Sequence, residues 1–206
     1  DGIRDPARSR GLGDVYKRPL QTLWARWPAD APPTLVVQHI PPVFSASFAH
    51  RLNAACPAVV LEVSARTPLR TGHVYLAPGD RHLVFDAGTA GPWADLRTGE
   101  KINRHRPSVD VLFDSLHGCA EMVVAGLLTG MGRDGAAGLL RLKQAGASTL
   151  AQDEATSVVW GMPGQAVAIG AVDAVVPLEG LVGEIFRRLP GDRTNGVSGG
   201  RGAVSA

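Results

Sequence analysis

Two places in the chain put residues capable of acid–base chemistry where α/β proteins usually build their sites. The first is Gln38-His39, which follows the apolar run TLVV and is stopped by Pro41-Pro42. Histidine titrates close to neutral pH, so an imidazole at the end of a strand can act as a general base. A histidine hydrogen-bonded to a backbone carbonyl is the structural alternative, and the residue types leave both open.

The second place is LLTGMGRDGAAGLL, in which an apolar strand runs into glycines and then into a helix. Asp134 lies at the start of that helix, where its carboxylate could orient a histidine. The glycine-flanked turn also offers backbone N–H groups that could bind an oxyanion. A plain helix N-cap is the alternative role for Asp134. A Ser-His-Asp arrangement would need a serine as well, and neither stretch supplies one.

The same glycines raise a dinucleotide-binding alternative. Gly130, Gly132 and Gly135 match the G-x-G-x-x-G spacing, and Asp153 follows roughly 20 residues on. Two points weigh against this function. The Asp134 carboxylate would repel a pyrophosphate at the helix N-terminus. The motif also comes late in the chain, with too few residues left for a second nucleotide-binding half.

Alternating apolar runs and helical patterns surround these two places. Strands are expected at 34–37, 59–63, 122–128, 148–152 and 172–177, with helices at 19–27, 44–54, 109–120 with Ser108 as the N-cap, 134–146, 162–170 and 178–189. The segments HVYLAP and HLVF indicate a hairpin around Pro78-Gly79-Asp80, and 86–101 is expected to be loop. This order predicts a doubly wound, mostly parallel sheet with helices on both faces, in three layers, with one β-hairpin insertion.

The composition of the chain argues against several classes of function. The 206 residues are 45% apolar and carry a net charge of +2 with both signs interspersed, so we expect one domain and no nucleic-acid partner. No apolar run approaches the roughly 18 residues of a membrane span, which argues against membrane insertion and favours the cytoplasm. Cys56 and Cys119 are isolated, without ligand spacing, so neither a metal nor another cofactor is expected.

The remaining histidines are weaker candidates. His105, in the loop segment RHRPS, could line a site. The other four lie in predicted helices or in the hairpin and are expected to be solvated: His50, His73, His82 and His117.

Several long motifs, in order, resemble the catalytic domain of the chemotaxis protein-glutamate methylesterase family, CheB. They are PTLVVQHIPPVFSASFAHRLN, GHVYLAPGDRHL, RHRPSVDVLFDSL, LLTGMGRDGAAGLLRLKQAGASTLAQDEATSVVWGMPGQAV and GAVDAVVPL. The resemblance runs from about Pro19 to Leu189, and the domain boundaries it implies are 19–190. It implies a serine hydrolase that removes methyl groups from glutamyl methyl esters of methyl-accepting chemotaxis receptors, often with glutamine deamidase activity.

By this resemblance, His39 is the general base and Asp134 the acid of the triad, while the Met131 N–H contributes to the oxyanion hole. The implied partner is the cytoplasmic helical region of the receptors, and a monomer is expected. A catalytically dead receptor-binding module and a dinucleotide-binding domain remain the alternatives.

The serine motif of the family is where the chain departs from the pattern. The family carries G-A-S-T-G-G after its first strand, and counting back from Leu20 without gaps places Gly11 to Tyr16 on that motif, with Gly13 at the serine. SRGLGDVYKR also resembles the translation of a transposon adapter used to prepare sequencing libraries. We therefore expect residues 1–18 to be a non-native or disordered leader and 191–206 a disordered tail. Ser9 is another possible nucleophile, and a natural pseudoenzyme is the alternative explanation.

Overall fold

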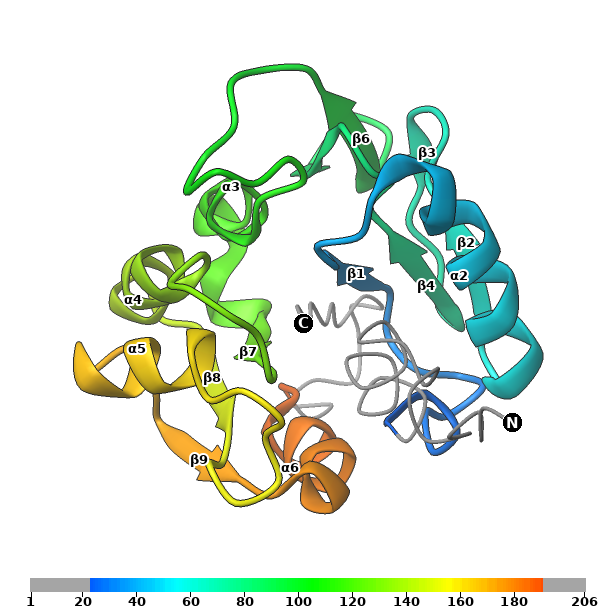
Figure 1. The fold of residues 1–206 in the computed structure, drawn as a ribbon. Helices are drawn as coiled ribbons and strands as arrows, with labels where there is room; N and C mark the ends of the chain where they lie inside the picture. Colours follow the sequence, from blue (N-terminus) through cyan, green and yellow to red (C-terminus); the bar gives the residue numbers. More distant parts are fainter. Residues whose placement is uncertain (1–22, 191–206) are drawn as a thin grey trace, which may run out of the picture.

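The computed structural model describes residues 23–190 (Figure 1). The predicted leader, Gly13 and the predicted tail therefore lie outside the described residues. Of the helix predicted over 19–27, Leu23 and Trp24 are helical in the described part. No helix in the described range is long and apolar enough to span a bilayer.

Six parallel strands form the centre of the domain, in two sets of three. The first set has the order β1-β4-β2 and the second the order β7-β8-β9. Their bounds are Thr34–Val36 (β1), Val59–Glu62 (β2), His73–Leu76 (β4), Val124–Leu127 (β7), Ser148–Gln152 (β8) and Ala174–Val176 (β9). Every pairing within the two sets is parallel. The predicted α/β class is confirmed, with the strands paired as two three-stranded sheets.

Both sheets lie between the same two hydrophobic cores. Successive residues of β1 alternate, so Leu35 packs into one core and Val36 into the other. Residues of β7 do the same, because Ala125 joins the core of Leu35 and Val124 joins the core of Val36. Since each core contains side chains from both sheets, the six strands act as a single middle layer.

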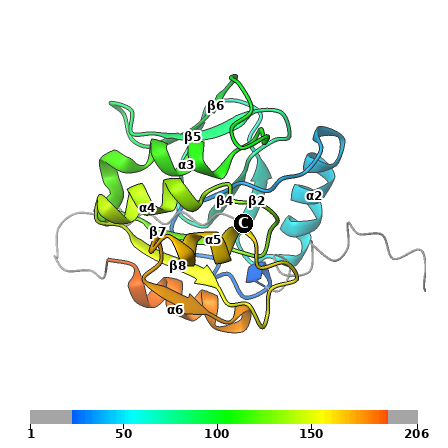
Figure 2. The same cartoon turned by 60° about the vertical axis from the view of Figure 1, so that its left-hand side comes forward.

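Helices cover both faces of this layer, as predicted. On one face lie α3 (Val109–Ser115), α4 (Ala136–Gln144) and α5 (Met162–Ala168), which contribute to the first core. On the other lie α2 (Pro42–Ala55) and α6 (Leu181–Arg188), which contribute to the second. Figure 2 shows α4 and α5 on one side of β8 and α6 on the other. Residues 23–190 also contain two short 3-10 helices, at His117–Met122 (η2) and Leu178–Gly180 (η3).

The hairpin lies later in the chain than the sequence predicted. β4 pairs with β1 on one side and β2 on the other, so neither edge is free for the next strand. That strand, β5 (His82–Asp86), pairs instead with β6 (Trp93–Arg97) in an antiparallel hairpin, to which β3 (Thr67–Pro68) adds a short edge. The prediction of a hairpin around Pro78 was therefore wrong, as was the prediction of loop throughout 86–101.

The α4 helix provides a test of the first core close to the loop that carries Asp134. Leu139 is fully buried in that core, and its neighbour Leu140 is only partly buried. We expect Leu139→Ala to lower the free energy of unfolding by about 2–5 kcal/mol, because it removes transfer energy and leaves a cavity. Leu140→Ala, the matched control, should cost less than half as much. Urea unfolding of the two variants measures the difference, and equal losses would contradict the packing described.

Candidate active site

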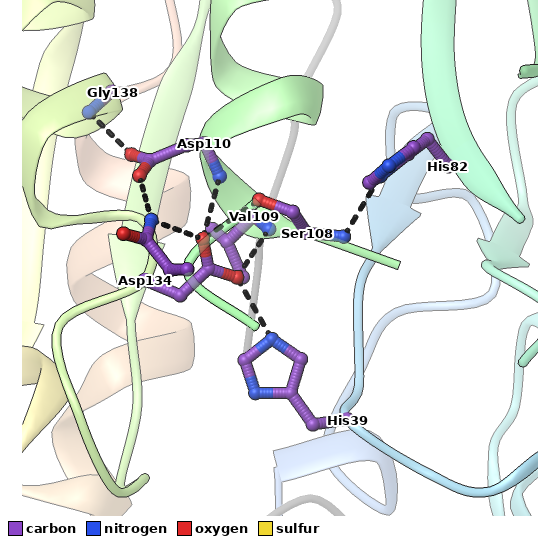
Figure 3. Close-up of polar contacts among 8 residues, drawn as sticks. His39, His82, Ser108, Val109, Asp110, Asp134 and Gly138 are labelled. Carbon is purple, nitrogen blue, oxygen red and sulfur yellow. Dashed lines mark hydrogen bonds and ion pairs between the residues drawn. The ribbon is translucent and has the colours of Figure 1, made fainter. Parts of the chain in front are cut away.

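His39 and Asp134 meet beyond the carboxyl ends of two strands, β1 and β7, that belong to the two parallel sheets. His39 follows β1 by three residues, and Asp134 lies in the loop between β7 and α4. The His39 Nε2 atom is 2.8 Å from Asp134 Oδ2 (Figure 3). Sites in open α/β sheets form beyond the carboxyl ends of the strands, which is where the sequence placed these two residues. The predicted contact between them is therefore present.

Asp134 is held by several donors at once. It is 1% exposed, and its Oδ1 accepts hydrogen bonds from Ser108 Oγ at 2.7 Å and Asn103 Nδ2 at 3.1 Å. Its Oδ2 accepts the Val109 N–H at 2.8 Å in addition to the His39 contact. Burial raises the pKa of this carboxyl, but the hydrogen bonds outweigh burial and hold the pKa at about 2. Asp134 is thus a fixed negative charge at any pH near neutrality.

Asp134 is not the N-cap residue of α4, which was the alternative role considered for it. The residue before α4 is Gly135, with φ 85°, so the N-cap position of that helix has no side chain. Asp134 instead accepts the N–H of Val109, the first residue of α3. Ser108 is the N-cap residue of α3, as predicted, but its hydroxyl donates to Asp134 and accepts no hydrogen bond from an N–H of that helix. One carboxylate thereby joins the start of α3 to the loop after β7.

A second buried carboxylate lies next to the first. Asp110 is 6% exposed and accepts the Gly138 N–H at 2.6 Å and the Asn103 amide at 2.7 Å. Burial is the main reason that its pKa is raised, opposed by the hydrogen bond from Gly138 and reinforced by the charge of Asp134. Asn103 therefore donates to both carboxylates with one amide group. No motif or residue spacing in the sequence predicted that Asn103 would bridge the two carboxylates.

His105 lies beside His39. The two rings are parallel, with centroids 3.7 Å apart and planes 9° apart. Burial is the largest cause that lowers the pKa of His105, and the neighbouring His39 lowers it further. A lowered pKa keeps His105 neutral at pH 7, so the stack does not place two positive charges in contact. The sequence prediction that His105 could line a site agrees with this position.

His82 corrects the prediction for the remaining histidines. It is 3% exposed, not solvated. Its Nδ1 accepts the Ser108 N–H at 3.2 Å and its Nε2 donates to the Glu100 carbonyl at 2.9 Å. A buried histidine satisfied by backbone groups was considered only for His39, but it describes His82. His50 and His117 are exposed as expected, and His73 is half-buried in β4.

Met131 lies in the same loop, three residues before Asp134, and is 64% exposed. The loop is fixed from behind, because the Gly130 carbonyl accepts the N–H groups of Gly161 and Met162. A Cβ on Gly161 would lie 2.6 Å from that carbonyl oxygen, so the close approach requires glycine. The Met131 N–H makes no hydrogen bond with the described residues. Its role in an oxyanion hole stays a prediction.

The geometry does not favour the dinucleotide alternative. The Asp153 carboxylate, which would have to reach a ribose, accepts hydrogen bonds from the backbone N–H and the hydroxyl of Thr156 in its own turn. Asp134 is turned into the protein, where Ser108 and Val109 occupy its oxygens. Neither aspartate is free to play the part that the glycine spacing suggested.

A cavity of about 350 Å³ opens beside His39. Its lining residues are His39, Ile40, Pro41, Pro42, Asp80, Lys101, Arg104, His105, Arg106 and Pro107. None of these described residues carries a hydroxyl or a thiol, so the cavity wall supplies a base but no nucleophile. Gly13, at the aligned serine position, lies outside the described residues.

The pairing of His39 with Asp134 is typical of one class of enzyme. A histidine oriented by a buried, ionised aspartate at the strand ends of an α/β fold is the arrangement of hydrolases that activate a nucleophile through histidine. Residues 17–185 match the CheB methylesterase family, and the chain belongs to that family. The resemblance noted in the sequence is thereby confirmed.

Individual relatives agree with this assignment. The chain is 49% identical over 191 residues to a protein-glutamate methylesterase/protein-glutamine glutaminase of Bordetella bronchiseptica, covering 92% of this chain and 53% of that protein. It is 52% identical over 159 residues to one of Hahella chejuensis, covering 77% and 44%. The crystal structure of the Thermotoga maritima CheB methylesterase catalytic domain superposes with a TM-score of 0.79 at 35% identity, covering 82% and 90%. The chain thus spans about half the length of these curated relatives.

The pKa of Asp134 leads to a pH-dependent prediction. An aspartate in the unfolded chain titrates near pH 3.9, whereas Asp134 in the folded protein has a pKa of about 2. At pH values above about 4, this difference contributes about 2 kcal/mol to the free energy of unfolding. This contribution is lost as the pH falls from about 4 toward 2. We expect Asp134→Asn to lower the free energy of unfolding at pH 7 by at least about 2 kcal/mol, with a smaller loss near pH 2.

Urea unfolding at pH 7 and at low pH measures both losses. Asp114→Asn is the matched control, because Asp114 is half-exposed and pairs with Arg141 on the surface. That control should cost less than about 1 kcal/mol. A loss in Asp134→Asn that is the same at both pH values would contradict the low pKa.

Proposed function

We propose that the chain carries the catalytic machinery of a protein-glutamate methylesterase, with the related glutaminase reaction at the same site. The observation that carries the proposal is the 2.8 Å contact between His39 and the buried Asp134 in a chain of the CheB methylesterase family. The relatives in Bordetella bronchiseptica and Hahella chejuensis are named for both reactions. The substrates proposed are glutamyl methyl esters in the cytoplasmic helical region of chemotaxis receptors, which places the activity in the cytoplasm.

Each residue then has a defined part. Asp134 engages His39 Nε2, which leaves Nδ1 as the nitrogen that takes a proton from the nucleophile. The nucleophile's oxygen bonds to the ester carbonyl carbon, and backbone N–H groups including that of Met131 stabilise the negative oxygen. The bond to the methoxy group breaks, and His39 returns its proton to release methanol. Water hydrolyses the acyl intermediate by the same steps, and ammonia replaces methanol in the glutaminase reaction.

The ionised state of Asp134 suits this scheme. With a pKa of about 2, it stays a carboxylate throughout the cycle and stabilises the positive imidazolium that forms each time His39 takes a proton. Its other donors, Ser108 and Val109, fix the direction of the carboxylate toward His39. Asp134 therefore acts by orientation and charge and does not itself accept the proton.

The polypeptide as written is proposed to be inactive, because Gly13 stands at the serine position and no hydroxyl or thiol lines the described cavity. A receptor-binding module without activity is the second candidate, and this same observation favours it.

Methanol release from methylated receptor tests the proposal. We expect the chain as written to be at least about 10⁴-fold slower than a version in which a strand and Gly-Ala-Ser-Thr-Gly-Gly replace the residues before Pro19. Gly13→Ser alone should not restore the rate, because the sequence before Pro19 contains neither an apolar strand pattern nor the Gly-Ala-Ser-Thr-Gly-Gly motif that would aim the hydroxyl. In the grafted version, His39→Ala should abolish the gain.

The controls separate the two candidates. A grafted chain that releases methanol only with His39 present supports the hydrolase. A chain as written that is as fast as the grafted version would contradict the missing nucleophile and point to Ser9 or another residue. A grafted chain that folds and binds receptor without releasing methanol would favour the binding module.

A further inference from the structure

The cavity beside His39 has a cationic wall. Lys101, Arg104 and Arg106 line it together with the two stacked histidines, and Asp80 is the only acidic residue among the lining side chains. Three of these basic residues fall within six positions of the sequence, which the overall charge balance of the chain conceals. The structure therefore concentrates positive charge at a cavity that His39 lines.

The single acidic side chain is already neutralised. Arg106 Nε donates to Asp80 Oδ1 at 3.0 Å, and a second guanidinium nitrogen contacts the same oxygen. The hydrogen bond from Arg106 is the largest cause that lowers the pKa of Asp80. Lys101 and Arg104, in contrast, are exposed and form no ion pair within residues 23–190. Two uncompensated positive charges remain at the cavity.

Asp134 does not neutralise them either. Its carboxylate is 1% exposed, and its oxygens are occupied by His39, Ser108, Val109 and Asn103. The negative charge of the site thus lies inside the protein, and the uncompensated positive charges lie at the opening.

The backbone that presents Arg104 is strained and anchored. Ile102 and His105 exchange both backbone hydrogen bonds, and the two residues between them, Asn103 and Arg104, have φ of 50° and 70°. These values define a type I′ turn, in which glycine is the usual second central residue. The left-handed backbone of Arg104 is strained, because its Cβ disfavours a positive φ. Asn103 holds the turn in place through Asp110 and Asp134, so the strained arginine stays at the cavity.

We infer that this cavity binds acidic peptide segments, with Lys101 and Arg104 as specificity-determining residues that contact carboxylates flanking the glutamyl ester. The inference rests on the proposed function for the position of the ester, and it adds a charge requirement for the residues around it. A protein partner fits better than a nucleic acid, because the only aromatic ring in the lining apart from His39 is His105, and the two already stack on each other.

Binding without turnover tests the inference on the chain as it stands. The probes are two dye-labelled synthetic peptides, each with one glutamyl γ-methyl ester, flanked by glutamates in one and by glutamines in the other. By fluorescence anisotropy at low salt, the glutamate peptide should bind about tenfold more tightly. High salt should remove most of this preference, since the charges at the opening are exposed.

Two variants assign the preference to its residues. Lys101→Gln with Arg104→Gly should reduce it to about twofold or less. The glycine variant is informative because a φ of 70° suits glycine, so the thermal midpoint should not fall although binding does. A merely structural Arg104 would leave binding intact in this variant. The matched control is Arg51→Gln with Arg70→Gln, two exposed arginines toward the amino ends of the strands.

Each outcome decides the inference. Equal binding of the two peptides, or an equal loss in the control variant, would overturn it. Tighter binding of a DNA oligonucleotide than of the glutamate peptide, lost in the same Lys101 and Arg104 variants, would also overturn it in favour of a nucleic-acid partner. Selective binding of the glutamate peptide by a chain whose grafted version never releases methanol would support the acidic-peptide site while removing the hydrolase proposal.

Discussion

The Asp134 carboxylate is a buried negative charge that must be satisfied by donors from several separate segments of the chain. A buried carboxylate is costly unless it is hydrogen-bonded, and here the donors are His39 after β1, Ser108 and Val109 at the start of α3, and Asn103 in the loop before α3. The position of His39 and the position of the cavity wall therefore follow from one electrostatic requirement. Losing any one donor would leave the charge less satisfied and loosen the others.

The same requirement explains how a buried negative charge and exposed positive charges occur close together in this domain. The negative charge is the Asp134 carboxylate, and the positive charges are Lys101 and Arg104 at the cavity. Asn103 shares its amide between Asp110 and Asp134, and the turn that it starts carries Arg104 outward to the cavity. His82 fixes the two ends of the same loop by binding the Glu100 carbonyl and the Ser108 N–H. The loop is thus tied to the interior at three points, which accounts for a defined arrangement of charges on an exposed segment.

The sequence predicted the order of most helices and strands, which follows from local hydrophobic patterns, and the contact between His39 and Asp134, which follows from their positions after strands. His39 and Asp134 each follow an apolar strand, and the rule for parallel sheets brings such residues together. The hairpin was misplaced because strand pairing is decided by tertiary neighbours: β4 is occupied on both edges, and this leaves β5 to pair with β6. The role of Asn103 and the burial of His82 arise from contacts with other segments of the chain, which periodicity and spacing do not reveal. The basic residues of 101–106 are adjacent in the sequence, but only the fold shows that they line the cavity beside His39.

The proposed catalytic mechanism depends most directly on the hydrogen bond between His39 and Asp134. ¹⁵N NMR of the imidazole nitrogens, at a pH where the His39 ring is neutral, reports which nitrogen carries the proton. The account predicts the Nε2–H tautomer, because Nε2 lies 2.8 Å from an ionised carboxylate that can only accept. It also predicts that Asp134→Ala removes this preference. A proton on Nδ1, or a tautomer mixture unchanged by the substitution, would contradict it.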